Sequence, residues 1–355
     1  MRILYFETTA YYPSSAHFLE ALRELGAERG WSFEFVDQSA YIPTHSSLGQ
    51  RIVARLLGRP SGYHALNKAL LDRALEFHPN LVLIGKGQFI SPDTLKAIRE
   101  ATGAVLVNWA TDDPFNPCNT SPNLVNSIPL YDLYVSTKLA VIPDLKRVGV
   151  NNTYVRFGYK PEVHYPETLT SASEQDRFAC EVAFIGGADA DRVPYFEKLL
   201  RGIPGLKLVL YGGYWNRYPA LRPYWRGEVF GREYRLAVAG AKIVVNLVRR
   251  GNRDDHVMRT FELPACGAFV LAERSVTHCE LFKENVEAAF FSSPDEMVER
   301  IRYYLPRDEE RRSIAEAGRR EILAGHHTYR DRLLQIIESA PSVFGAAGAV
   351  PTECL

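Results

Sequence analysis

The stretch LVLIGKGQFISPDTLKAIREATGAVLVNWATDD, residues 81–113, decides the fold class of this 355-residue chain. It opens with a near-continuous apolar run, which is typical of a parallel strand buried on both faces. Ser91 and Pro92 follow in the pattern of a helix N-cap and a first helical residue. A second apolar strand then begins at residue 104. A strand, a helix and a strand joined by short loops predict a parallel α/β sheet with right-handed crossovers.

The same alternation extends in both directions along the chain. Residues 2–6 and 31–36 have strand patterns, with an amphipathic helix pattern at residues 17–30 between them. After a polar run the alternation restarts at EVAFIGG (residues 181–187) and continues to AFVLAE (residues 268–273). We therefore expect an α/β protein with two facing Rossmann-like domains, whose ligands bind at the carboxyl ends of the strands in the cleft between the sheets.

The boundaries of these domains follow from where the pattern breaks. We expect a first, acceptor-side domain at residues 1–165, a linker at 166–179 and a second, donor-binding domain at 180–325. The polar Ser/Thr/Glu run is the basis for the linker. A C-terminal helix and tail at residues 326–355 are expected to pack back on the first domain.

The composition excludes several classes of protein. Lys+Arg and Asp+Glu both number 42, so the chain lacks the basic excess typical of nucleic-acid binding. Its five scattered cysteines show no C-x-x-C spacing, which argues against disulfides or zinc. We find no signal peptide and no apolar run near the ~20 residues of a membrane helix, and therefore expect a cytoplasmic protein. Arg51, Arg55 and Arg59 form a row typical of a solvated helix face, and they leave peripheral membrane or acceptor contact open.

Polar side chains follow the predicted strands of the first domain. Glu7 follows the first strand, Lys86 follows the strand at the start of the quoted stretch, and Asp112-Asp113 follow the next one. Strand ends of a parallel sheet meet at one edge, so these groups are candidates for chemistry there. Asp112-Asp113-Pro114 is also a plausible turn. Further candidates near the first strand end are Tyr11, Tyr12 and His17.

The second domain has residue types suited to a nucleoside diphosphate. The pairs Gly186-Gly187 and Gly212-Gly213 allow close backbone approach, although neither completes a G-x-G-x-x-G motif. Arginines suit phosphate oxygens, aromatic rings can stack on a base, and a carboxylate suits a ribose diol. The candidates of these types are Arg192, Tyr211, Tyr214, Trp215, Arg249, Asp254, Arg259 and Glu262.

The segment RTFELPACGAFVLAE (residues 259–273) is similar to the C-terminal domain of GT-B glycosyltransferases. It has an Arg, two residues, a Glu, a short Pro/Ala segment, Cys-Gly and a buried strand. Pro294-Asp295-Glu296, Gly318-Arg319 and His327-Thr328-Tyr329 continue the resemblance downstream. Over roughly residues 180–335 the chain resembles the spore-maturation-type group, which is related to retaining family-four glycosyltransferases.

This resemblance implies roles for the donor-site residues. Glu262 would accept hydrogen bonds from the ribose hydroxyls of the donor, and Arg259 would hold its pyrophosphate at a helix N-terminus. Asp254 stands eight positions before Glu262. Family-four enzymes have a Glu there, near the donor sugar.

The resemblance also implies an activity, which is sugar transfer from a nucleotide-sugar donor to a glycan, lipid-linked or small-molecule acceptor. The enzyme would be hexosyltransferase-like, retaining in preference to inverting, and free of metal or other cofactor, because arginines would stabilise the leaving phosphates. We expect a role in polysaccharide or cell-surface glycan synthesis. For inversion, the candidate bases are, in order, Asp112, Asp113, Glu7 and His17. The alternatives are a nucleotide-sugar epimerase or hydrolase on the same fold, and a non-catalytic nucleotide-binding or spore-coat-type structural protein.

Overall fold

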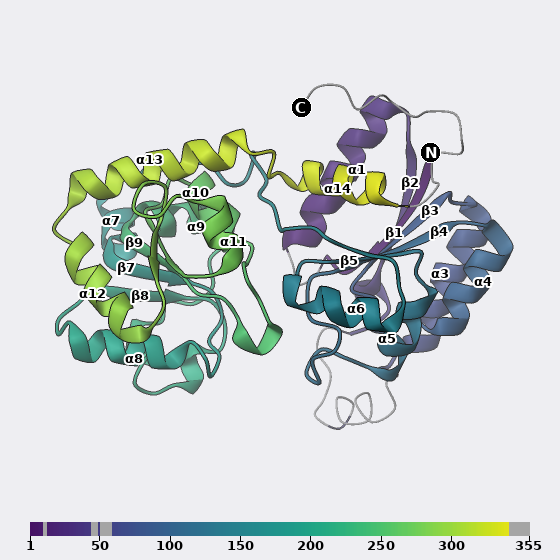
Figure 1. Cartoon of the computed structure of the whole chain (residues 1–355), viewed down its shortest axis with the longest axis horizontal. Coiled ribbons are helices and arrows are strands. Elements are labelled where there is room, and N and C mark those ends of the chain that lie inside the picture. Colours follow the sequence, from purple (N-terminus) through teal and green to yellow (C-terminus); the bar gives the residue numbers. More distant parts are fainter. Residues whose placement is uncertain (10–12, 44–48, 50–58, 341–355) are drawn as a thin grey trace. The chain divides into compact units, whose positions relative to one another are not determined.

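The computed structural model describes residues 1–9, 13–43, 49 and 59–340. The chain forms two compact units, each built on a parallel β-sheet (Figure 1). The first unit comprises Met1–Arg156 together with the chain from Tyr329 onward, and the second comprises Phe157–Thr328. No helix within the described residues is long and apolar enough to cross a membrane.

The sheet of the first unit has the strand order β2-β1-β3-β4-β5-β6, and its described pairings are all parallel. The quoted stretch forms its central strand-helix-strand unit, and Ser91 Oγ accepts a hydrogen bond from Thr94 N at 3.0 Å, as expected of an N-cap. The strands are β1 (Arg2–Glu7), β2 (Ser32–Asp37), β3 (Leu81–Gly85), β4 (Val105–Ala110), β5 (Leu133–Ser136) and β6 (Asn152–Tyr154).

Helices cover both faces of this sheet, because successive strand residues point to opposite sides. Leu4 and Val82 pack into a core with α3 and α4, whereas Ile3 and Leu83 pack into a core with α1 and α14. The helices are α1 (Pro13–Arg29), α3 (Tyr63–Phe77), α4 (Pro92–Thr102), α5 (Pro122–Ser127), α6 (Ile142–Val148) and α14 (Tyr329–Ser339), with 3-10 turns η1 (Gln38–Ala40), η2 (Ile128–Leu130) and η3 (Leu139–Val141).

Helix α14, which follows the second unit in the chain, packs on the first unit. It lies beside α1 in Figure 1 and buries Leu333, Ile336 and Ile337 in the core that contains Ile3. At the surface, the Arg330 guanidinium donates to both carboxylate oxygens of Glu28 in α1, at 2.6 and 2.5 Å. The first unit is thus completed by residues from the far end of the chain.

The second unit repeats the architecture with the strand order β11-β10-β9-β7-β8, again parallel. The prediction of two Rossmann-like α/β domains is therefore confirmed. The strands are β7 (Cys180–Ile185), β8 (Leu208–Tyr211), β9 (Ala241–Asn246), β10 (Val270–Glu273) and β11 (Ala289–Phe291). The helices are α7 (Ala172–Phe178), α8 (Val193–Gly202), α9 (Gly231–Ala239), α10 (Arg259–Ala265), α11 (Val276–Leu281), α12 (Pro294–Tyr304) and α13 (Asp308–Ala324), with η4 (Trp215–Arg217), η5 (Arg222–Tyr224) and η6 (Arg250–Asn252).

The polar run that we interpreted as a linker is partly helical and lies within the second unit. Ser171 Oγ accepts from Glu174 N, and the Glu174 side chain accepts from Ser171 N, so a capping box starts α7. Phe178 at the other end of α7 is buried in the core of this unit. A Ser/Thr/Glu-rich composition suits a helix N-terminus as well as a linker, which is why composition did not separate the two.

Candidate functional site

Two Gly-Gly turns interlock at the carboxyl ends of β7 and β8. Gly186 N donates to Tyr211 O, and Ala188 N donates to Gly213 O, both at 2.9 Å. Gly212 has a φ of +114°, and a Cβ built there would lie 2.4 Å from Gly186 O. Only glycine allows this approach without strain. The close backbone contact suggested by the sequence is therefore present, and it joins the two turns to each other.

The three aromatic residues after β8 have very different exposures. Trp215 is fully buried between Phe184 and Phe196, and its Nε1 donates to Gly186 O at 2.9 Å. Tyr211 is buried in the core. Tyr214 is 57% exposed, and the Arg217 guanidinium lies 4.4 Å from its ring centroid. Of the three rings that we considered for base stacking, Tyr214 is the exposed one.

Arg192 binds carbonyl groups of the sheet edge. Its Nη1 donates to Gly187 O at 2.9 Å and its Nη2 donates to Leu247 O at 3.1 Å, so it ties the turn after β7 to the end of β9. Burial lowers the pKa of Arg192, and the nearby charges of Arg249 and Arg259 lower it further. Three guanidinium groups thus lie near this edge, and the buried one, that of Arg192, links the turn after β7 to the end of β9.

Helix α10 brings Arg259 and Glu262 together. Arg259 Nε donates to Ile185 O at 3.1 Å, and its Nη1 forms an ion pair with Glu262 Oε2. The hydroxyl of Tyr234 donates to the same carboxylate at 3.4 Å, and the Tyr234 ring lies 5.0 Å from the Arg259 guanidinium. The residues on which the family resemblance depends therefore form one cluster at the end of β7.

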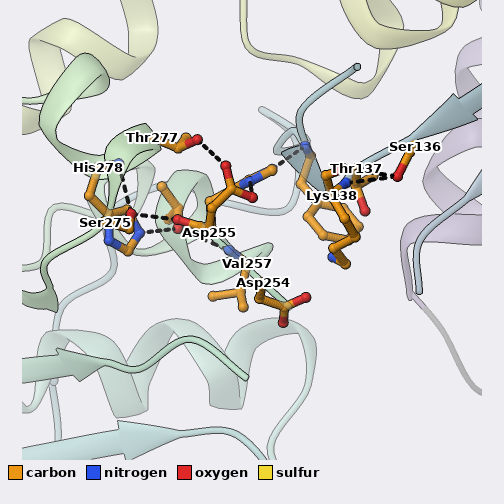
Figure 2. Close-up of polar contacts among 12 residues, drawn as sticks. Ser136, Thr137, Lys138, Asp254, Asp255, Val257, Ser275, Thr277 and His278 are labelled. Carbon is orange, nitrogen blue, oxygen red and sulfur yellow. Dashed lines mark hydrogen bonds and ion pairs between the residues drawn. The ribbon is translucent and has the colours of Figure 1, made fainter. Parts of the chain in front are cut away.

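Asp254 and Asp255 point in different directions from one loop (Figure 2). The Asp255 carboxylate accepts from the Thr277 hydroxyl, and its backbone oxygen accepts from Ser275 Oγ at 2.5 Å. Asp254 Oδ1 accepts from Asn252 Nδ2 at 2.8 Å, and the charge of Asp254 acts on Arg192 at the β7 edge. Asp255 therefore anchors the loop to α11, and Asp254 is the carboxylate of this pair whose charge acts on Arg192.

A buried polar network fixes α10 and α11 beneath this loop. His278 Nδ1 donates to Glu273 O at 2.6 Å, so its Nε2 can accept from the Thr260 hydroxyl at 2.8 Å. Thr260 Oγ1 in turn accepts from Asn246 Nδ2 at 3.2 Å. Burial lowers the pKa of His278, which favours the neutral ring that this pattern requires. Figure 2 shows His278 beside Ser275, whose Oγ accepts from His278 N at 3.0 Å.

Sequence analysis missed two polar groups at this edge. The first is Glu273 at the end of β10, which accepts from Arg250 Nη2 at 2.8 Å, from the Tyr195 hydroxyl at 3.2 Å and from Val248 N at 3.2 Å. Its position at a strand end was the available signal. The second is His164, whose Nε2 lies 3.6 Å from Glu262 Oε1. It is remote from Glu262 in the sequence and follows no strand, so its position beside Glu262 was not predictable, although the stretch FGYKPEVHYP around it resembles the glycosyltransferase family.

The first unit gathers Glu7, Lys86 and Asp112 at the ends of three neighbouring strands. Lys86 Nζ donates to Asp112 Oδ2 at 2.8 Å. Gly85 leaves the space that Glu7 occupies, since a Cβ at Gly85 would lie 1.7 Å from Glu7 Oε2. Burial raises the pKa of Glu7 to about 7, with Thr8 N and Lys86 opposing the shift and Asp112 adding to it. This edge therefore holds a carboxyl group that can exchange a proton near neutral pH.

The other candidates of the first unit lie elsewhere. Asp113 Oδ1 accepts from Phe115 N at 3.0 Å and so caps the turn after β4. His17 is buried in α1, with its ring 5.3 Å from that of Tyr329 in α14. Tyr11, Tyr12, Arg51 and Arg55 lie outside the described residues. Where the chain is described, there is no cluster of three or more His, Cys, Asp or Glu side chains that could hold a metal ion.

Known proteins resemble this chain in part of its sequence and in its fold. Residues 192–338 match the family described as "Glycosyl transferase-like", in the part of the chain where the sequence resembles the GT-B glycosyltransferases. The matched range includes Arg259, Glu262 and the loop with Asp254. The chain matches no curated protein sequence.

Solved structures resemble the chain over almost its whole length. Sucrose-phosphate synthase from Thermosynechococcus elongatus is 13% identical with a TM-score of 0.69, over 95% of this chain and 98% of that one. Anabaena Alr3699/HepE in complex with UDP-glucose is 13% identical with a TM-score of 0.65, over 96% and 99%. α,α-Trehalose 6-phosphate synthase from Burkholderia multivorans is 12% identical with a TM-score of 0.63, over 99% of each chain. These likenesses show the fold, a pair of Rossmann-like units of the GT-B type.

Proposed function

We propose that this protein is a glycosyltransferase that moves a sugar from a nucleotide-sugar donor to an acceptor hydroxyl. The observation that carries the proposal is the Arg259–Glu262 pair, which is held against Ile185 O at the end of β7. The pair lies inside the segment that matches the glycosyl transferase-like family. The product is a glycan or cell-surface polysaccharide, as the family resemblance implies.

The donor nucleotide binds at the carboxyl edge of the second unit in this proposal. Glu262 accepts the ribose hydroxyls, and Arg259 and Arg249 bind the pyrophosphate, because guanidinium groups match phosphate oxygens. Tyr214 offers a ring to the base, and Asp254 faces the donor sugar. UDP is the first nucleotide to test, since the HepE structure of the same fold contains UDP-glucose.

The chemical step needs stabilisation of the negative charge that develops on the leaving diphosphate. Arg259 and Arg249 supply positive charge for this without a metal. We therefore propose a metal-independent reaction with retention of stereochemistry, as in the family-four enzymes that the sequence resembles. Activity that survives EDTA and a product of unchanged anomeric configuration would support this part of the proposal.

In this proposal, residues at the carboxyl edge of the first unit bind and orient the acceptor hydroxyl. Glu7 is the first candidate for the group that accepts the proton of this hydroxyl, because a carboxyl group with a pKa of about 7 can take a proton near neutral pH. Asp112 is held by Lys86 and orients the acceptor together with it. In a retaining reaction these groups position the hydroxyl, and in an inverting one Glu7 removes its proton.

The test is a thermal-shift panel of UDP, GDP, TDP, CDP and ADP. Binding at about 100 times Kd stabilises the native state by about 2.7 kcal/mol, so one nucleotide should raise the melting temperature by roughly 5–10 °C. Glu262→Gln should abolish the shift. Glu284→Gln breaks a different Arg–Glu pair of the same unit, with Arg274, and should leave the shift intact.

Turnover assays then separate the alternatives. Release of the nucleoside diphosphate that depends on an acceptor supports transfer. Hydrolysis or epimerisation of the donor without an acceptor would support the epimerase or hydrolase alternative. Nucleotide binding without any product would support a non-catalytic protein, and no shift with any nucleotide would contradict the donor site itself.

A further inference from the structure

The segment that enters the second unit is fastened to α9 and to the loop that precedes α10. Phe157 N donates to His256 Nε2 at 3.0 Å. Arg235 of α9 donates to Val163 O at 3.2 Å, and its guanidinium lies 3.9 Å from the ring centroid of Tyr165. Residues 157–165 therefore hold a defined position beside α9 and the loop that leads into the helix carrying Glu262.

His164 in this segment has two ring nitrogens with different partners. Nδ1 accepts from Lys160 N at 3.0 Å, so it carries no proton, and the neutral ring has its hydrogen on Nε2. Nε2 lies 3.6 Å from Glu262 Oε1. His164 is 6% exposed, and burial lowers its pKa, which favours the neutral form.

The Glu262 carboxylate is thus approached from two sides. Its Oε2 receives Arg259 Nη1 and the Tyr234 hydroxyl, and its Oε1 faces His164 Nε2. The charges that act on His164 come from Glu262, Arg259 and Arg235, and the Tyr234 ring meets the imidazole edge-on at 5.9 Å. Contacts on both oxygens restrict the rotamer of a carboxylate, and its orientation decides whether it can receive a diol.

We propose that His164 is a positioning residue of the donor site, which holds Glu262 through Nε2 in the orientation that receives the nucleotide. The inference rests on the proposed function, because it assigns a role to the Glu262 site. The competing role is local, since Val163 N and His164 N both donate to Lys160 O, and His164 Nδ1 completes that turn. The two roles use different nitrogens and can be separated.

Two substitutions distinguish the nitrogens. His164→Asn keeps an acceptor near Nδ1 for Lys160 N but loses the donor toward Glu262. His164→Gln places an amide N–H near the Nε2 position but loses the acceptor at Nδ1. Both variants and wild type are titrated with the nucleoside diphosphate that shifts the wild-type melting temperature, with Glu262→Gln as reference. Melting without nucleotide reports whether each variant is folded.

We expect His164→Asn to weaken nucleotide binding about 10-fold, because the contact of Nε2 with the Glu262 carboxylate at 3.6 Å is lost. His164→Gln should stay within about 3-fold of wild type. In turnover, His164→Asn should raise the donor KM while kcat changes little, since the interaction is made in the ground state.

Unchanged binding by His164→Asn, with binding lost in Glu262→Gln, would overturn this inference and leave the proposed function standing. Three other outcomes would assign His164 to the turn and would also overturn the inference. Nucleotide binding could be weakened in His164→Gln alone, it could be weakened equally in both variants, or both variants could fail to fold. Wild-type protein that binds none of the five nucleotides would overturn the proposed function, and this inference with it.

Discussion

A glycine stands at a strand end in each unit, and the two glycines make room for different groups. At Gly212 in the second unit a Cβ would meet the backbone oxygen of Gly186, whereas at Gly85 in the first unit it would meet the carboxylate of Glu7. The first arrangement brings two backbone turns together. The arrangement at Gly85 leaves space for the Glu7 carboxyl group between strand ends, where burial raises its pKa to about 7.

The groups around the two glycines differ in the same way. The second unit gathers Arg192, Arg249 and Arg259 at its edge, which suits an anion. The first unit gathers Glu7 and the Lys86–Asp112 pair, which suits a hydroxyl group and its proton. Two sheets of one architecture therefore carry different chemistry because function resides in the residues that follow the strands.

The largest expected effect is at Gly212. Gly212→Ala should lower the free energy of unfolding by about 4 kcal/mol, because the positive φ and the clash with Gly186 O both oppose a side chain. Urea denaturation followed by tryptophan fluorescence measures it, since Trp215 and Trp225 donate to the two turns. Gly205→Ala is the control, with a φ of +81° and nothing near its Cβ, and should cost about 1 kcal/mol. Equal losses would mean that the turns are not interlocked.

The next effect is the pH dependence of stability caused by Glu7. Its pKa is about 7 in the folded state and 4.5 as the reference value, so the folded chain keeps a proton that the unfolded chain releases between these values. The free energy of unfolding should fall as pH rises through this window, by up to roughly 3 kcal/mol. Glu7→Gln should remove that fall and be the more stable protein at pH 8.

Urea titrations from pH 4.5 to 8 measure this difference. Glu34→Gln in β2 is the control, because the Glu34 side chain is 41% exposed. A Glu7→Gln profile parallel to that of wild type would show that Glu7 ionises as it does in water and would remove it as the leading proton acceptor.

A smaller effect is expected at Gly85. Gly85→Ala should cost about 2 kcal/mol, because the new methyl group occupies the place of the Glu7 carboxylate. In the Glu7→Ala background the same change should cost less than about 1 kcal/mol, since the carboxylate is gone. A double-mutant cycle in urea gives the coupling. Additive effects would mean that Gly85 is needed for another reason.

The smallest effect concerns Tyr214. Tyr214→Ala should weaken binding of the preferred nucleotide about 5-fold without changing the melting temperature of the free protein, if a base stacks on this exposed ring. Tyr303→Ala is a matched control, because Tyr303 is 44% exposed and also lies under a guanidinium, that of Arg307. Isothermal titration compares the two. Identical affinities would place the base away from the end of β8.

Local sequence patterns predicted several of the strands and the start of one helix. Apolar runs located β3, β4, β7 and β10, and Ser91-Pro92 located the start of α4, because burial and capping act over a few residues. The strand order β11-β10-β9-β7-β8 was not predictable in this way, since it depends on which crossovers pack together. Helix α7 was missed because Ser171 and Glu174 resemble a polar linker until they are seen to cap each other.

In the candidate donor site, too, some features were predictable from local sequence and others depended on the tertiary structure. The spacing of Arg259 and Glu262 indicated that the two side chains lie on one helix. The structure brings them together because residues three apart share a helix face. Which of Tyr211, Tyr214 and Trp215 is exposed depended on the turn, where Tyr214 adopts a φ of +71° and Trp215 returns to the core. The sequence does not distinguish Asp254 from Asp255, whereas in the structure Thr277 donates to Asp255 and Asn252 donates to Asp254.

The sequence by itself determined the two parallel sheets, the glycosyltransferase resemblance and the residue types at the strand ends. Those features depend on hydrophobic period and short motifs, which neighbouring residues specify. Only the tertiary structure decided that Gly85 leaves room for Glu7 and that His164 faces Glu262. The physical reason is that burial, pKa and hydrogen-bond partners are set by groups distant in the chain, and packing alone brings these together.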